Sequence, residues 1–194
     1  MADAATREEL ACRLDAALPQ TQCRRCGFDG CRPYADALAA GTTELNRCPP
    51  GGAEVIGRLA RLLGRPERPL DPACGREGPP MVAWIDEPAC IGCARCLDDC
   101  PTDAIVGARK RMHTVIAVDC SGCELCLPAC PVDCIRIVPA PGLPAAVPDA
   151  RLLDERAARF HRRHEARVAR RAREQADWQS KLAASLGPHG PAPD

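Results

Sequence analysis

The sequence predicts an α+β protein, in which a small helical unit precedes a repeated, strand-containing unit and a C-terminal helix. Three observations support this prediction. Apolar residues recur at helical spacing over the first sixty-odd residues, a cysteine-rich segment repeats at an offset of thirty residues, and an Arg-, Ala- and Glu-rich stretch lies near the end. Only 3% of the 194 residues are aromatic, so large side chains cannot supply most of the stability.

The N-terminal unit, residues 1–63, is expected to consist of helices. Leucines recur at every fourth position in a first helix over residues 1–18. A second helix, over residues 32–40, has a proline near its start and a glycine just past its end. A third apolar stripe covers residues 55–63 and stops at Gly64.

Segments rich in proline and glycine divide the rest of the chain. Residues 64–80 hold eight Gly or Pro in seventeen positions, which predicts a linker. The unit that follows, residues 81–138, contains four expected strands, at 81–85, 104–108, 113–118 and 134–138. The remaining expected segments are a Pro-rich linker over 139–148, a basic helical extension over 149–186 and a disordered tail over 187–194.

Fifteen cysteines in a chain with so few aromatic residues indicate that disulfides or metal hold the fold together. The first twenty residues show no secretory signal pattern, and nowhere are about eighteen consecutive residues apolar. We therefore expect a cytoplasmic protein with reduced thiols, in which clustered cysteines bind metal. The formal net charge of zero argues against a chain that binds nucleic acid along its whole length.

The repeated segment reads C-x2-C-x2-C-x3-C-P in both copies. With this spacing, three neighbouring thiolates hold one [4Fe–4S] cluster and the fourth cysteine reaches the other cluster. Zinc takes four ligands, often as two C-x2-C pairs, and does not explain two runs of four that each end in proline. The sequence therefore predicts a first site formed by Cys90, Cys93, Cys96 and Cys130, and a second site formed by Cys120, Cys123, Cys126 and Cys100.

Another set of cysteines lies upstream and defines a third candidate site, formed by Cys23, Cys26, Cys31 and Cys48. Three of these cysteines share one loop, and the fourth follows the expected second helix. The spacing suits a site of four thiolates, but it does not by itself choose between zinc and an iron–sulfur cluster.

The two cysteine runs make residues 86–138 resemble a bacterial-type two-[4Fe–4S] ferredoxin domain. The upstream segment is similar to the four-cysteine Fe–S domain found in the B subunit of the Rnf/Rsx-type electron transport complex and in corrinoid iron–sulfur proteins. In that B subunit this domain precedes a ferredoxin unit, which is the order found over residues 8–138. The resemblance implies a third [4Fe–4S] cluster, and so three clusters on twelve cysteines. The B subunit typically begins with a hydrophobic membrane helix, and this chain resembles a form without it.

No nucleophile, acid–base pair or nucleotide-binding fingerprint is apparent, so we expect neither a small-molecule substrate nor a catalyst in its own right. We expect an iron–sulfur protein that relays single electrons. The resemblance implies that its partners are a low-potential electron carrier and other subunits of a membrane electron transport complex, on the cytoplasmic face of the bacterial inner membrane. The alternatives are a stand-alone ferredoxin that donates to an unrelated reductase and a zinc-stabilised interaction module.

The three cysteines outside these sites are interpreted as structural residues. Cys12 and Cys134 are expected in the core, and Cys74 is expected to be a free thiol in the linker. The four histidines lack ligand-like spacing with any cysteine pair and are expected on the surface or on helices.

The arginine-rich run over residues 151–173 is expected to form a solvated helix face, because acidic residues intersperse it. Ion pairs one turn apart are expected there, for example between Arg159 and either Asp154 or Glu155. Nucleic-acid binding by this run is not favoured. Its docking on an acidic redox partner or on a membrane surface is the alternative.

Overall fold

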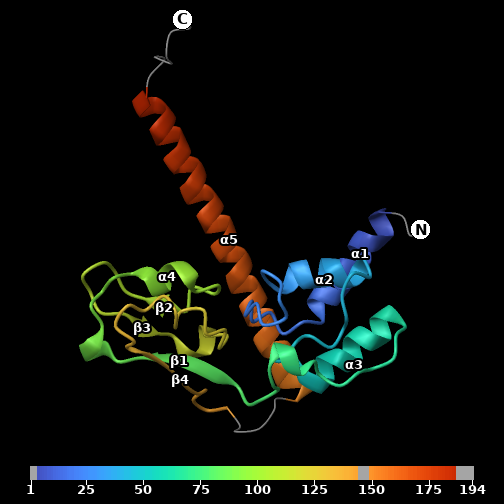
Figure 1. The fold of residues 1–194 in the computed structure, drawn as a ribbon. Helices are drawn as coiled ribbons and strands as arrows, with labels where there is room; N and C mark the ends of the chain where they lie inside the picture. The colour runs from blue at the N-terminus through green and yellow to red at the C-terminus, as the bar shows by residue number, and fades with distance from the viewer. Residues whose placement is uncertain (1–3, 144–148, 187–194) are drawn as a thin grey trace, which may run out of the picture.

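The computed structural model describes residues 4–143 and 149–186, which form two small units and one long helix (Figure 1). The helical unit holds α1 (Ala4–Ala16), α2 (Cys31–Ala39) and α3 (Gly52–Leu63). The repeat unit holds β1 (Met81–Ile85), α4 (Arg95–Asp99), β2 (Ile105–Val106), β3 (Thr114–Val115) and β4 (Ile135–Pro139). Short 3-10 turns lie at Pro72–Cys74, Glu87–Ala89 and Ala117–Asp119, and α5 (Ala150–Leu186) follows. The predicted α+β class is confirmed.

The three helices of the helical unit enclose one apolar core. Leu14 and Leu18, at the spacing that predicted α1, are almost fully buried together with Tyr34 and Leu59. The Tyr34 hydroxyl donates a hydrogen bond to the carbonyl oxygen of Glu44 at 2.9 Å, so the buried ring keeps a partner for its polar end.

The repeat unit contains two small antiparallel sheets rather than one. In the β1–β4 pair, Met81 lies opposite Pro139 and Ile85 lies opposite Ile135. Pro139 has no N–H, and the outer end of a two-stranded sheet tolerates it. The β2–β3 pair is shorter than the sequence predicted. A 3-10 turn over Ala117–Asp119 replaces the end of the strand expected over 113–118.

Cysteines make up much of the core of the repeat unit. Apolar side chains from the strands, such as Val82, Ile85 and Ile105, supply the rest. The buried cysteines among them are Cys96, Cys100, Cys120, Cys126 and Cys134. Thiols are small, so a core of this kind requires a further source of cohesion.

Helix α5 runs between the two units, and its C-terminal half extends beyond them (Figure 1). Asp149 caps it, since the Asp149 carboxylate accepts the N–H of Leu152 at 2.8 Å. Leu153 and Phe160 are buried in its first half, whereas Trp178 in its second half is 65% exposed. Over the described residues no helix has both the length and the apolar content needed to cross a membrane.

The predicted linker, residues 64–80, packs against the helical unit. The N–H of Asp71 donates to the carbonyl oxygen of Asn46 at 2.8 Å, and the Asp71 carboxylate pairs with Arg47 at 3.3 Å. The domain limits themselves stay a prediction. The expected tail, 187–194, and half of the Pro-rich linker, 144–148, lie outside the described residues.

Candidate metal centres

The cysteines of the predicted first site come from both repeats. Three of them lie on the loop that leads into α4 and within α4, and Cys130 follows the corresponding loop of the second repeat. The pKa of the Cys96 thiol is raised to about 11, first by burial and then by the neighbouring thiols of Cys93, Cys90 and Cys130. The influence of Cys130 on the Cys96 thiol shows that Cys130 lies close to the first three cysteines.

The predicted second site has the converse composition. Cys100, from the first repeat, lines one small cavity together with Cys120, Cys123 and Cys126. The pKa of the Cys126 thiol is raised to about 12 by burial and then by the other three thiols. In space, therefore, the fourth cysteine of each repeat lies with the three cysteines of the other repeat, as the spacing predicted.

Backbone N–H groups point at the cysteine sulfurs in a pattern that obeys the thirty-residue repeat. Ala83 N donates to Cys120 Sγ at 3.3 Å, and His113 N donates to Cys90 Sγ at 3.4 Å. Ala104 N donates to Cys100 Sγ at 3.2 Å. Donors of this kind stabilise thiolates, so they fit residues that ligate a cluster.

Gly92 and Gly122 take equivalent places in the two repeats, with φ of 69° at both. A Cβ at Gly92 would lie 2.6 Å from Arg111 N, and one at Gly122 would lie 2.4 Å from Met81 O. Only glycine fits here, because another segment of backbone passes against each cysteine loop.

The predicted third site also lines one small cavity, to which Cys23, Cys26, Cys31 and Cys48 all contribute. Burial raises the pKa of the Cys31 thiol to about 12. The loop that leads into these cysteines has left-handed φ values at Gln20 and Gln22, and Arg24, between Cys23 and Cys26, has one as well. The Gln22 side chain secures this loop, because its Oε1 accepts the N–H of Cys31 at 2.9 Å.

The cysteines of the second and third sites line small cavities instead of converging on a point, and those of the first site lie close to one another. Within residues 4–143 and 149–186, no three Cys, His, Asp or Glu side chains are grouped closely enough to hold one metal ion. A [4Fe–4S] cluster binds each thiolate through a different iron, so thiols around a cavity are what it requires. The residues therefore fit such clusters, while the assignment of each ligand stays a prediction.

Two contacts join the third site to the second. Ser121, between Cys120 and Cys123 in the chain, donates its hydroxyl to the carbonyl oxygen of Thr21 at 3.0 Å. Arg25, between Cys23 and Cys26, pairs with Glu124 at 2.5 Å. The sequence did not predict these contacts, because nothing in a pattern of spacing relates residues about one hundred positions apart.

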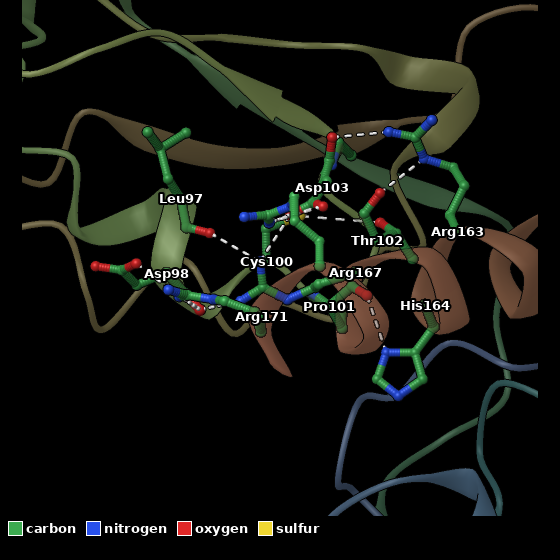
Figure 2. A network of polar contacts seen from close by, with 12 residues as sticks. Leu97, Asp98, Cys100, Pro101, Thr102, Asp103, Arg163, His164, Arg167 and Arg171 are labelled. Carbon is green, nitrogen blue, oxygen red and sulfur yellow. Dashed lines mark hydrogen bonds and ion pairs between the residues drawn. The ribbon is translucent and has the colours of Figure 1, made fainter. Parts of the chain in front are cut away.

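The arginine run of α5 binds the loop that carries Cys100 (Figure 2). Arg163 donates to the carbonyl oxygens of Thr102 at 2.7 Å and Asp103 at 2.8 Å. Arg167 and Arg170 pair with the Asp103 carboxylate at 2.7 Å and 2.9 Å. The expectation of a wholly solvated helix face is thus wrong, because this face of α5 neutralises acidic residues of the repeat unit.

The ion pairs expected within the helix are also wrong for Arg159. Its guanidinium pairs with Asp119 of the repeat unit at 2.7 Å. Asp154 instead pairs with Arg58 of α3, and Glu155 pairs with Arg151. Asp119 is buried in the 3-10 turn over Ala117–Asp119, and helical spacing alone does not reveal a partner in another element.

The predictions for the three cysteines outside the three sites were only partly correct. Cys134 is buried as predicted, and Cys74 is a free thiol, but a buried one. Cys12 is exposed, which contradicts its expected core position, because the buried face of α1 passes through Ala11 and Leu14 instead.

The histidines also differ from the prediction in one case. His161 and His164 lie on α5, whereas His189 lies outside the described residues. His113 was expected at the surface but is buried, with 1% exposure. The equivalent position in the first repeat, Ala83, is also buried, but the cysteine spacing does not reveal which segment covers His113.

Two family models match the chain. A model of a 4Fe-4S dicluster domain matches residues 83–137, and a model of an Fe-S cluster domain matches residues 18–50. These two segments contain all twelve of the predicted ligands.

Curated relatives named as the B subunit of an ion-translocating oxidoreductase complex are also similar to this chain. The relative from Alkalilimnicola ehrlichii is 63% identical over 132 residues, which are 67% of this chain and 70% of the relative. The relative from Thiobacillus denitrificans is 60% identical over 108 residues, or 56% of this chain and 57% of the relative. The relative from an Azoarcus species is 56% identical over 109 residues, or 56% and 60%. The chain thus spans less than two thirds of the second and third relatives.

Proposed function

The chain belongs to the family of B subunits of ion-translocating oxidoreductase complexes, and we propose that it relays single electrons within a complex of that kind. The observation that carries this proposal is the grouping of twelve cysteines into three sets of four, two of which line small cavities. We propose that each set holds one [4Fe–4S] cluster, three in all. When bound, such a cluster takes up and releases one electron.

The protein residues contribute ligation, hydrogen bonds and burial. The cysteine thiolates hold the iron, and the N–H groups of Ala83, Ala104 and His113 donate to three of the sulfurs. Burial of Cys31, Cys96 and Cys126 keeps water away from the metal side of each site. Ligation, hydrogen bonds and burial together set the reduction potential of each cluster, with no change of conformation required.

The contacts between the units support an order for the three sites. The Thr21–Ser121 hydrogen bond and the Arg25–Glu124 ion pair put the third site next to the second. The crossing of Cys100 and Cys130 between the repeats supports a position of the second site next to the first. We propose that the second site is therefore the middle one and that the first and third sites face the electron donor and acceptor.

The names of the relatives support other subunits of an ion-translocating complex as partners. We propose that a low-potential one-electron carrier is the remaining partner and that the chain lies at the cytoplasmic face of the membrane. Co-expression with the membrane subunits and capture on a tag at either end test this proposal. Co-purification of those subunits supports it, and a chain that always purifies alone supports a free-standing ferredoxin instead.

Serine variants of three cysteines test the crossed ligand sets. Under the proposal, Cys100→Ser and Cys126→Ser change the same electron paramagnetic resonance (EPR) signal of the reduced protein, while Cys96→Ser changes another. If the sets were not crossed, the spectrum of Cys100→Ser would match that of Cys96→Ser. Cys12→Ser is the control, since Cys12 is exposed and lies outside every set.

A further inference from the structure

The surroundings of the first and second sites follow the thirty-residue repeat, with differences at several positions that face sulfur, two of which add a side chain to the first site. His113 takes the place that Ala83 has in the other repeat, and Cys134 takes the place of Ala104. Both alanines contact a cysteine sulfur through the backbone alone. The first site therefore has two side chains that the second site lacks.

The His113 side chain faces two predicted ligands of the first site. Its Nδ1 lies 3.4 Å from Cys90 Sγ and 3.9 Å from Cys96 Sγ. A ligating thiolate can only accept a hydrogen bond, so Nδ1 must carry hydrogen in this arrangement. Among the described residues, the other ring nitrogen, Nε2, is buried without a hydrogen-bond partner.

Gly107 makes room for this ring. A Cβ at Gly107 would lie 2.1 Å from Cδ2 of His113, and Gly107 has a φ of +153°. Any other residue at position 107 would displace the imidazole. The local backbone is therefore matched to the presence of the ring, which fixes Nδ1 against the sulfurs.

The Cys134 side chain faces the fourth ligand of the first site. Its Sγ lies 3.4 Å from Cys130 Sγ, and Cys134 is buried. With Cys130 bound to iron as a thiolate, the hydrogen between the two sulfurs belongs to Cys134. In the second site, the Thr102 hydroxyl is 3.8 Å from Cys100 Sγ, but its hydrogen goes to the carbonyl oxygen of Asp119 at 2.8 Å.

We propose that His113 and Cys134 donate hydrogen bonds to the thiolates of the first site and raise its reduction potential above the value that the ligands alone would give. The inference rests on the proposed function, because it assumes that the first site holds a cluster. Reduction adds negative charge, which spreads onto the thiolates, so a donor to sulfur stabilises the reduced state more than the oxidised state. Two sites that each have four cysteine ligands thereby differ in reduction potential.

Exchange of residues between the repeats provides the test. His113→Ala and Cys134→Ala give the first site the residues of the second, while Ala104→Cys gives the second site a thiol of the first. The measurement is an EPR-monitored redox titration of the full chain, purified without air. We expect the first-site midpoint potential to fall by about 59 mV in each alanine variant. For one electron this is a tenfold change in the ratio of reduced to oxidised protein at a given potential. We expect the second-site midpoint to rise in Ala104→Cys.

Conservative variants separate donation from packing. His113→Asn and Cys134→Ser retain a donor close to the same sulfur and should restore most of the lost potential. Isotope-labelled histidine should also give a nitrogen hyperfine coupling to the first-site signal, and His113→Ala should abolish that coupling. Neither readout responds to a ring or thiol that only fills space.

The outcomes distinguish this inference from the proposed function. An iron-free repeat unit in the unaltered chain would overturn both. Clusters with unchanged midpoints in the alanine variants would overturn the inference alone. If those variants lose their clusters, the inference is tested by two other measurements. These are the histidine coupling in the unaltered protein and the second-site midpoint of Ala104→Cys. Absence of the coupling together with an unchanged second-site midpoint would then refute the proposal.

Discussion

At the scale of single residues, seven of the twelve cysteine thiols in the three sites have a raised pKa, so their surroundings favour the protonated form when no metal is bound. Burial is the largest cause, and it raises the pKa of Cys31 and Cys126 to about 12 and that of Cys123 to about 11. A free thiol in a protein has a pKa of about 8.5. The ligating form is the thiolate, so iron must displace these protons.

Cluster retention should therefore depend on pH. At about pH 7 the raised pKa values leave the thiols protonated after any loss of metal, so protons compete with iron; at about pH 9 the competition weakens. We expect a chelator to strip iron faster and more completely at the lower pH. Iron loss can be followed by the decay of the brown absorbance in chelator solutions at the two pH values.

The exposed Cys12 provides the control for this pH dependence. Cys12→Ser should lose iron with the same pH dependence as the unaltered chain, since this thiol belongs to none of the three sites. Equal stripping at both pH values, or faster stripping at the higher one, would contradict the account.

The residue scale also shows what sequence could predict. The two cysteine runs predicted which thiols of the repeat unit lie close to one another, because the spacing of a cluster motif is a local property of a loop. The burial of His113 and the exposure of Cys12 were missed, since they depend on which segment packs across the position. For His113 that segment is the Cys90 loop, which lies 23 residues away in the chain.

At the scale of elements, α5 is held to the repeat unit mainly by polar contacts. Its arginines bind backbone carbonyls and carboxylates of residues 97–103, with Phe160 as a buried apolar anchor. The Arg167 side chain is 11% exposed and donates to the carbonyl oxygens of Leu97 and Asp98 and to Asp103. Carbonyls bound in this way lose their partner when the arginine is removed.

Removal of Arg167 should therefore loosen α5 from the repeat unit. We expect Arg167→Ala to weaken this docking by about 1.5–3 kcal/mol, the range for hydrogen bonds to charged groups. Hydrogen exchange measured by mass spectrometry should show faster exchange in residues 97–103 and in the first half of α5.

Arg162→Ala is the matched control on the same helix, because Arg162 is exposed and its side chain makes no hydrogen bond or ion pair within the described part of the chain. It should leave the exchange pattern unchanged. Equal effects of the two variants would show that the arginines act through overall charge rather than through these contacts.

The Arg-, Ala- and Glu-rich composition predicted α5 almost to the residue but gave no indication of its partner. An arginine-rich helix looks solvated in sequence because its charges alternate in sign along the chain. Asp98, Asp103 and Asp119, which receive these arginines, are 40 or more residues away. Short strands were harder to place than the helix, since two-residue pairs such as β2–β3 leave little periodic signal.

At the scale of the whole molecule, the two units are joined where their cysteine loops meet. The Thr21–Ser121 and Arg25–Glu124 contacts link residues that neighbour ligands of the third and second sites, and α5 contacts both units. The order of the domains followed from the sequence by resemblance. Their mutual placement did not, because it rests on a few polar contacts between loops.

The central claim is that twelve cysteines hold three [4Fe–4S] clusters. The most direct test is the content of iron, acid-labile sulfide and zinc in the full chain purified without air. The account predicts about twelve iron and about twelve sulfide for each chain, with no zinc. About eight iron would remove the cluster from the third site, and zinc without sulfide would contradict the account altogether.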